Sequence, residues 1–270
     1  MKRKQYWLYL PALLLSVGTV YPLLWNVMGG FKNARDAANF SGALIPAQPT
    51  VSNYRTIIGA TPFLHYVWNT LLYAGSVTVV ALLVAASGGY ALARLRFPGR
   101  RVLFVGILST MMIPFSVIMI PLFLIVKSLG WVNSLWGLIV PSLFGGFSVF
   151  LCRQFFMGLP RELEEAGKMD GLSIIGIFFR IALPLSRPIL YALSVFIFLA
   201  NWNNYLWPLI LLQTPNTWVL SLGISSFATN HSTQWNLVMA ATTLAVLPTL
   251  SLFAVFQKKL VEGIKLTGGK

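Results

Sequence analysis

The residues of this sequence with the clearest chemical potential are acidic and lie close together. Four of the six acidic residues fall within nine positions: Glu162, Glu164, Glu165 and Asp170. Pro160 suits the first position of a helix, acidic side chains stabilise its first turn, and Gly171 can end it in a left-handed conformation. Helical spacing then places four residues on one face: Leu163, Ala166, Gly167 and Asp170. The pattern predicts a short acidic helix that begins at Pro160 and is closed by Gly171, with one face of mainly small residues.

Motifs for covalent chemistry are missing. A nucleotide-binding P-loop needs G-x-x-x-x-G-K-[ST] between a strand and a helix. The tail Thr267-Gly268-Gly269-Lys270 ends before any hydroxyl residue or helix. No Ser-His-Asp grouping could share a site, and no Cys/His cluster has the spacing of metal ligands. We therefore expect no catalytic residue, no bound cofactor and no metal in this chain.

The composition places these residues in a membrane protein. Of 270 residues, 57% are hydrophobic and only 10% are charged, with a mean hydropathy of +0.75. Soluble domains carry about 25% charged residues. The net charge of +14 sits in short clusters between apolar runs of spanning length, which excludes a nucleic-acid-binding domain and indicates a polytopic membrane protein. The single cysteine, Cys152, cannot form an internal disulfide.

Six transmembrane helices are predicted, in an all-α protein whose residues 1–270 form a single transmembrane domain. The expected spans are residues 6–28, 66–93, 102–126, 135–151, 188–212 and 236–257, with a polar segment at 153–187. The first span is about twenty residues long and carries bulky side chains near its end, which favours a retained helix over a cleaved signal peptide. Pro114 and Pro121 predict that the third span is kinked.

Both termini are expected to be cytoplasmic. This orientation places sixteen of the twenty basic residues on the cytoplasmic side, where they can also contact anionic lipid headgroups. The four exceptions are Lys32, Arg35, Arg55 and Lys127. The even number of spans agrees with this topology.

The spans contain no evident source of energy for transport. Seventy consecutive residues, 188–257, include no Asp, Glu, Lys or Arg. Proton-driven carriers need a carboxylate or histidine within the membrane, whereas His65 lies at a span boundary and His231 in an outer loop. A sodium site made of backbone carbonyls needs no charged side chain, so the missing charges do not argue against this alternative. If the protein pumps, its energy must enter from the cytoplasmic side.

The acidic helix fits two interpretations, a membrane-surface helix and a docking helix. Helices that lie on anionic leaflets favour Lys and Arg on their polar face, so an acidic helix is poorly suited to that position. Small side chains at Ala166 and Gly167 would also let another protein approach closely. The sequence therefore favours docking onto a partner.

A group of polar and aromatic residues lies within the fifth apolar segment. Its members are Asn201, Trp202, Asn203, Asn204, Tyr205 and Trp207. A helix from Pro188 would place Asn201 about 20 Å from its start, in the outer third of the hydrocarbon layer. Amides with flat aromatic rings suit a sugar, which makes the group a candidate substrate pathway. An aromatic belt with hydrogen bonds between helices is the competing explanation.

The polar segment also carries a known signature. Glu165-Ala166-Gly167, three residues, Gly171, nine residues and Ile181-Ala182-Leu183-Pro184 follow one another. This order resembles the EAA signature of ABC-importer permeases, with Gly167 in place of the second Ala. Three further blocks resemble the maltose-permease G-type subunits of carbohydrate importers: Arg94-Leu95-Arg96-Phe97-Pro98-Gly99-Arg100, Arg153-Gln154-Phe155-Phe156 and Trp202-Asn203-Asn204-Tyr205-Leu206-Trp207-Pro208.

The resemblance implies a type I ABC-importer permease fold, in which residues 162–171 form a coupling helix seated in a cleft of a separate ATPase. The implied coupling residues are Glu162, Glu165, Ala166, Gly167, Asp170, Gly171, Ile181, Leu183 and Pro184. Gly171 would turn the chain sharply out of the helix, and the last three residues would anchor its return into the fifth span.

The resemblance also implies a bacterial-type inner membrane as the location of the protein, and a set of partners. They are a second permease subunit, two ATPase subunits that bind ATP and magnesium, an extracytoplasmic solute-binding protein and membrane lipid. The solute would be an oligosaccharide, a sugar derivative or a glycerol-phosphate-type compound, imported without covalent chemistry in this chain. The alternatives are an ion-coupled secondary carrier and a membrane scaffold without ATPase coupling.

Overall fold

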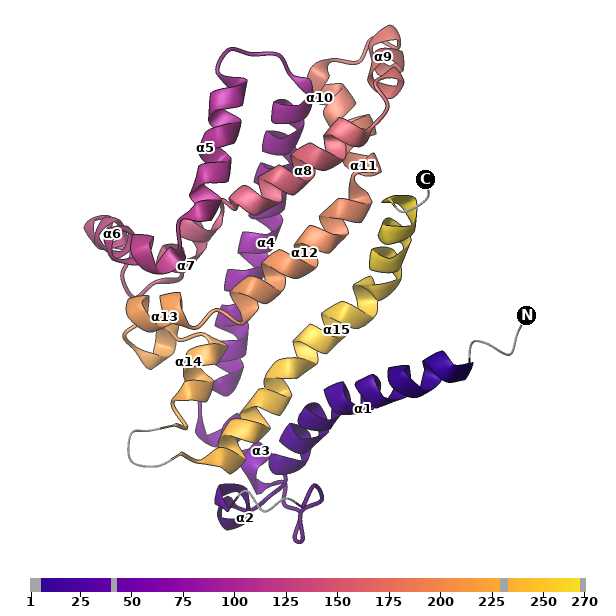
Figure 1. Ribbon diagram of the computed structural model, residues 1–270. Coiled ribbons are helices and arrows are strands. Elements are labelled where there is room, and N and C mark those ends of the chain that lie inside the picture. Colours follow the sequence, from indigo (N-terminus) through magenta and orange to yellow (C-terminus); the bar gives the residue numbers. More distant parts are fainter. Residues whose placement is uncertain (1–5, 40–42, 229–232, 268–270) are drawn as a thin grey trace. The chain divides into compact units, whose positions relative to one another are not determined.

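The computed structural model describes residues 6–39, 43–228 and 233–267, in which the regular elements are helices (Figure 1). These ranges contain one isolated β-bridge, between Ala228 and Thr233, and no longer strand. The helical content follows from the apolar runs, whose backbone groups must bond within the segment in a membrane. The prediction of an all-α protein is confirmed. His231 and the terminal Gly268-Gly269-Lys270 lie outside the described residues.

The chain divides into two compact units. The first comprises Met1–Val67 and Leu220–Pro248, and the second comprises Trp68–Val219 and Thr249–Lys270. The boundary passes through helices α4 (Phe63–Arg94) and α15 (Trp235–Thr267). Both long helices therefore contribute residues to each unit.

The first unit is organised around a buried amide. It contains α1 (Tyr6–Gly29), α2 (Ala34–Ala38), α3 (Ser52–Ala60), α14 (Leu220–Ser225) and the beginning of α15. Asn53 of α3 donates to two backbone carbonyl oxygens, each at 2.8 Å. Asn236 of α15 donates in turn to Asn53 Oδ1 at 2.7 Å. These bonds satisfy polar groups that would otherwise be costly to bury, and they join α15 to α3.

The second unit contains most of the helices. They are the greater part of α4, α5 (Arg100–Met112), α6 (Phe115–Ser128), α7 (Leu135–Ser142), α8 (Gly146–Gly158), α9 (Glu162–Met169), α10 (Ile174–Ile177), a π-helix (Phe178–Ala182), α11 (Leu183–Leu185), α12 (Arg187–Trp202), α13 (Leu206–Leu211), a 3₁₀ turn (Pro215–Thr217) and the end of α15. At the contact between α4 and α8, a Cβ atom on Gly89 would lie 2.8 Å from the backbone nitrogen of Arg153. The glycine thus allows the two helices to touch. Tyr90 and Phe156 pack edge to face beside this contact.

Several helices could cross a membrane. Four ranges are long and apolar enough by themselves: Tyr9–Gly29, Phe63–Arg94, Leu135–Gly158 and Trp235–Gln257. Two further candidates are bent pairs, α5 with α6 at 104° and the segment Ile174–Leu185 with α12 at 75°. Counting each bent pair as one span gives up to six, the number predicted from the sequence.

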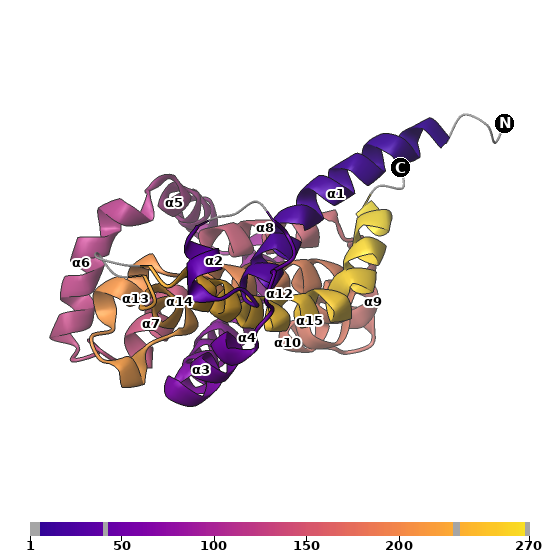
Figure 2. The same cartoon turned by 90° about the horizontal axis from the view of Figure 1, so that it is seen from below.

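The third predicted span is not one continuous helix. It separates at Ile113 into α5 and α6, which lie nearly at right angles (Figure 2). The cause is Pro114, because a proline disfavours helical torsions in the residue before it. Ile113 accordingly adopts an extended conformation, with φ −89° and ψ 117°. Pro121 lies within α6 without ending it, so only one of the two prolines breaks the span.

Candidate functional site

The acidic segment folds into α9, as the sequence predicts, but the helix starts at Glu162, two residues after Pro160. Three of its acidic residues lie in the first turn, where they stabilise the helix dipole. Gly171 follows the helix with a φ of +77°. Leu172 N–H donates to Gly167 O at 2.9 Å and Gly171 N–H donates to Lys168 O at 3.0 Å. This pair of bonds is a Schellman motif, which explains the glycine at position 171.

The inner side of α9 is fixed to its own unit by an ion pair and by close packing. Arg94 Nε lies 3.1 Å from Glu164 Oε1, and the two side chains are 7% and 17% exposed. Arg94 also donates to the backbone oxygen of Leu159. A Cβ atom on Gly167 would meet Ile181 Cδ1 at 2.7 Å and Ile177 Cγ1 at 3.3 Å.

Gly167 therefore lies against the chain's own isoleucines, and not on a face open to another protein as the small-residue stripe suggested. The reason is helix geometry, since Gly167 lies on the same side as Glu164, three residues earlier. Ala166, one residue away, is exposed.

The outer side of α9 is exposed and partly apolar. It carries Glu162, Leu163, Glu165, Ala166, Met169 and Asp170. Met169 is 89% exposed and Leu163 is 40% exposed, while the nearby Ile174 and Ile175 are 54% and 69% exposed. Large apolar side chains gathered on a surface commonly mark an interaction site. We call Leu163, Met169, Ile174 and Ile175 the apolar tip.

The chain returns from α9 through a second, short helical segment. Ser173 caps α10, accepting from Gly176 N–H at 3.1 Å. Pro184 does not end this segment, which continues through a π-turn to Leu185 before the bend. In the π-turn, Leu183 N–H bonds to Phe178 O, five residues earlier. This widened turn shifts the hydrogen-bond pattern, so the missing N–H of Pro184 is tolerated.

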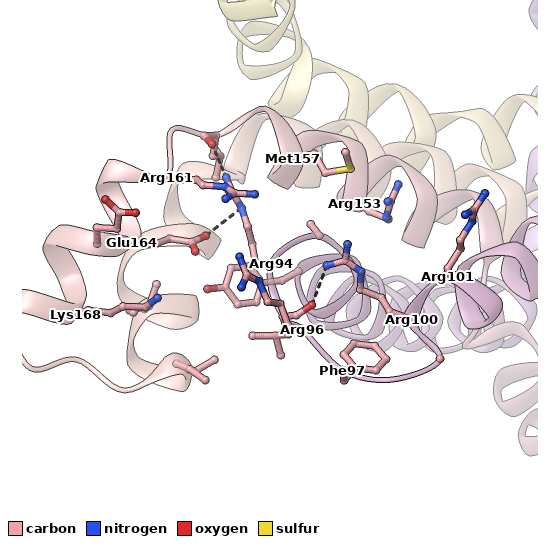
Figure 3. A pocket seen from close by; sticks show the side chains of 18 residues that line it. Arg94, Arg96, Phe97, Arg100, Arg101, Arg153, Met157, Arg161, Glu164 and Lys168 are labelled. Carbon is pink, nitrogen blue, oxygen red and sulfur yellow. Dashed lines mark hydrogen bonds and ion pairs between the residues drawn. The ribbon is translucent and has the colours of Figure 1, made fainter.

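A basic pocket of about 1060 Å³ lies next to α9 within the second unit. Figure 3 shows its basic side chains, with α9 carrying Glu164 on one side and α5 carrying Arg100 and Arg101 on the other. Seven cationic side chains and two carboxylates line it, a formal excess of five positive charges. The cations are Arg94, Arg96, Arg100, Arg101, Arg153, Arg161 and Lys168. The pocket thus favours negative charge.

Three of these arginines are fixed by the chain itself. Arg94 is in the ion pair described above, and Arg100 donates to Leu95 O at 2.9 Å. Arg153 donates to Leu92 O at 3.3 Å, and its guanidinium lies 3.9 Å from the centre of the Phe104 ring. In the sequence these arginines appear as topology signals and as parts of two blocks that resemble importer permeases, and neither role predicts a pocket. Their convergence depends on tertiary contacts that no local pattern reveals.

The candidate substrate-pathway residues separate into two groups. The first is used in packing: Trp207 is 2% exposed and donates from Nε1 to Gly137 O at 3.0 Å, and Asn204 donates to Tyr73 Oη at 3.0 Å. Trp202 is 4% exposed. These contacts agree with the alternative to a substrate pathway, in which the polar and aromatic groups bond and pack between helices.

The second group lies at a break between helices. Helix α12 ends at Trp202 and α13 begins at Leu206, so the predicted span 188–212 is interrupted. Asn203 and Tyr205 in the break are exposed, and Asn201 is half-buried. Asn201 and Asn203 donate to backbone oxygens four residues earlier, at 2.8 and 2.9 Å. Asn203 and Tyr205 have side chains available to a ligand.

Several apolar helices of spanning length, an interrupted fifth span and an acidic helix anchored on one side are the features of a multi-pass membrane protein. Residues 77–266 match the family described as binding-protein-dependent transport system inner membrane component, and the chain belongs to this family. It is therefore a permease subunit of an ATP-driven importer in the bacterial inner membrane. Membership implies ATPase and solute-binding-protein partners. The predictions of family, function and location are confirmed.

Two relatives support this assignment, and one solved structure shares the fold. The chain is 32% identical to the arabinooligosaccharides transport system permease protein AraQ of Bacillus subtilis (strain 168), over 96% of this chain and 93% of that protein. It is 34% identical to the lactose transport system permease protein LacG of Rhizobium radiobacter, over 91% and 89%. The fold is similar to that of a bacterial ABC transporter involved in the import of the acidic polysaccharide alginate, with a TM-score of 0.81 and 24% identity over 96% of this chain and 98% of that chain.

Proposed function

We propose that this subunit imports a neutral sugar of disaccharide or oligosaccharide size, and that ATPase subunits drive it by gripping α9. The observation that carries the proposal is the division of α9 into two sides. Glu164 and Gly167 fix the inner side, while Met169 and its apolar neighbours are exposed on the outer side. A helix built in this way can pass an external force into the helices to which it is attached.

The inner contacts define two routes for that force. Arg94, the partner of Glu164, is the last residue of the spanning helix α4. The isoleucines that touch Gly167 belong to the helical segment Ile174–Leu185, which leads into α12 through the 75° bend. A displacement of α9 is therefore expected to move the ends of α4 and α12 together.

The outer contacts would be made with the ATPase. The apolar tip supplies surface that is stabilised when a partner covers it, because burying apolar area is favourable. Glu162, Glu165 and Asp170 are exposed on or directly after the same helix and would pair with basic residues of the partner. The tip thus adds four residues that the implied coupling set did not include: Leu163, Met169, Ile174 and Ile175.

We infer an assembly with one further permease subunit and two ATPase subunits, in which ATP and magnesium bind to the ATPases and this chain performs no catalysis. The sequence supports this division of labour because it contains no P-loop. The solute-binding protein would deliver the sugar from the outer side.

A neutral sugar is favoured by two observations. The relatives AraQ and LacG are named for arabinooligosaccharides and lactose. Residues 188–257, which include the interrupted segment, contain no charged side chain that would pair with an ionised solute. Asn203 and Tyr205 offer an amide and an aromatic ring at the break, groups suited to sugar hydroxyls and sugar C–H faces.

Disulfide crosslinking tests the coupling role of α9. The single native cysteine, Cys152, is buried, so a Cys152→Ser chain provides a background for new cysteines. In the assembled transporter, Met169→Cys should crosslink to cysteines placed in the cleft of the ATPase, and ATP should change the yield. Ser109→Cys, on an exposed face of α5, is the matched control and should not crosslink. Failure of Met169→Cys in every nucleotide state would contradict the proposal.

Reconstitution separates the ATP-driven importer from an ion-coupled carrier. Liposomes that contain the complete assembly should accumulate arabinooligosaccharide or lactose only with internal ATP and the external binding protein. Uptake by the permease subunits alone under a sodium or proton gradient would instead support a carrier. ATP-driven uptake of another solute would leave the coupling role intact but reject the neutral sugar.

A further inference from the structure

The basic pocket beside α9 contains more positive charge than the chain neutralises. The side chains of Arg96 and Arg101 make no hydrogen bond or ion pair with any residue that the structure describes. Both are exposed at the pocket, whereas Arg94, Arg100 and Arg153 are bound to the chain. Like charges brought together in a hollow repel one another unless an anion joins them. The pocket is therefore incomplete without a negatively charged group.

The position of the pocket links it to the membrane surface. Arg94 ends the apolar helix α4, and Arg100 begins the apolar helix α5. The turn between them is made possible by Gly99, with a φ of +79°. Basic residues at the ends of spanning helices lie at the level of the lipid headgroups. The cations thus meet the layer in which lipid phosphates are found.

An apolar surface continues from the basic residues along α5. None of the residues of this helix is buried. Val102, Leu103 and Val105, which directly follow the arginine pair, are 75%, 56% and 52% exposed. A free phosphate ion has no apolar part that could cover these side chains. The acyl chains of a lipid would cover them, which is favourable because it removes apolar area from water.

We propose that this pocket binds one anionic phospholipid, with its phosphate among Arg96, Arg100 and Arg101 and its acyl chains along α5. The phosphate supplies the negative charge that the pocket lacks, because guanidinium groups bond phosphate oxygens through paired N–H donors. Phe97, 36% exposed, flanks the arginines at the rim. Since Arg94 both lines the pocket and holds Glu164 of α9, the lipid sits next to the attachment of the acidic helix. The bound lipid would make that attachment sensitive to membrane composition.

Lipid retention by the assembled transporter tests the proposal. The assembly is placed in nanodiscs of phosphatidylcholine, with or without phosphatidylglycerol. Native mass spectrometry then counts the lipids that stay bound to the transporter after it is released from the nanodisc. The unmodified transporter should retain phosphatidylglycerol selectively. Arg96→Gln/Arg101→Gln should lower this retention by about tenfold or more, because each basic residue near the surface contributes to the attraction of anionic lipid.

A matched variant controls for general surface charge. Arg180→Gln/Arg187→Gln removes two exposed cations of the same unit that do not line the pocket, and it should retain phosphatidylglycerol normally. Equal loss in both double variants, or no loss in Arg96→Gln/Arg101→Gln, would overturn the proposal. The second result would mean that a protein partner or solvent ions neutralise the pocket.

Inorganic phosphate distinguishes a lipid from a free anion. In nanodiscs with phosphatidylglycerol, added phosphate should not displace the bound lipid, because it lacks the acyl contacts with α5. Val102→Asn should weaken lipid retention while leaving the arginines in place. If phosphate displaces the lipid readily, or if Val102→Asn has no effect, the pocket is a simple anion site and the lipid assignment is wrong.

Discussion

Breaking the ion pair between Arg94 and Glu164 should detach α9 from the end of α4. The most informative variants are Arg94→Gln and Glu164→Gln, which remove one charge each and preserve much of the side-chain volume. Arg94→Gln also loses the hydrogen bond to Leu159 O, while Glu164→Gln leaves that bond intact. We therefore expect Arg94→Gln to have the larger effect.

The structure sets the magnitude of this effect. Exposed ion pairs contribute up to about 1 kcal/mol, whereas removing one partner of a buried pair costs about 3–5 kcal/mol. The side chains of Arg94 and Glu164 are 7% and 17% exposed, with 3.1 Å between the charged atoms. This burial lies between the two cases, so we expect a loss of about 2 kcal/mol for Glu164→Gln. The loss corresponds to a change of about 30-fold in the ratio of attached to detached helix.

Hydrogen exchange measured by mass spectrometry on the assembled transporter can detect this change. Amides of α9 should exchange faster by roughly the same factor if they exchange from the detached state. Glu162→Gln removes an equal charge from an exposed position of the same helix that does not line the pocket, and it should leave α9 attached. ATP-driven uptake per ATP hydrolysed should fall in the pair variants, because a detached helix passes less force to α4.

A double-mutant cycle decides whether the two residues act through each other. If they do, Arg94→Gln/Glu164→Gln should be little worse than Arg94→Gln alone, and the exchanged pair Arg94→Glu/Glu164→Arg should recover part of the protection. Fully additive losses would refute the reasoning. So would unchanged exchange of α9 in both single variants.

Three further outcomes follow from the geometry of the same unit. Gly167→Val should reduce both thermal stability and uptake, because the new side chain would collide with Ile181, and Ile181→Ala in the same chain should restore part of the loss. Gly171→Ala should cost about 1 kcal/mol in thermal unfolding of the assembly, since φ is +77°, and Gly171→Asn should cost less because Asn tolerates this conformation. Trp207→Phe should cost about 1 kcal/mol by losing its buried bond to Gly137 O, measured as a lower unfolding temperature, with sugar affinity unchanged.

The sequence predicted the elements whose signals are local. The acidic first turn and Gly171 placed α9 within two residues of its observed start, because caps and torsional preferences act over a few positions. Apolar length located the spanning helices for the same reason. Pro114 was identified as a source of bending, but the size of the bend, 104°, depends on how α6 packs and could not be obtained from the residue alone.

The parts that escaped prediction depend on contacts between distant residues. Arg94 and Glu164 are seventy positions apart, and nothing in either local sequence indicates that they meet. The pocket was missed for the same reason, because its cations come from the ends of α4, α5 and α8 and from α9. Trp207 resembled a sugar-stacking residue by type, whereas its burial gives it a packing role.

The acidic cluster shows why the role of a residue on α9 depends on its side of the helix more than on its charge. Glu164 and Glu165 are adjacent and chemically alike, yet a step of one residue turns the helix by about 100°. Glu164 consequently faces Arg94 and is largely buried, while Glu165 is exposed at the basic pocket. The buried acid is neutralised within the chain, whereas the exposed acids keep their charge for a partner. A variant that moves one acid to the other side would retain the composition of the segment and lose its function.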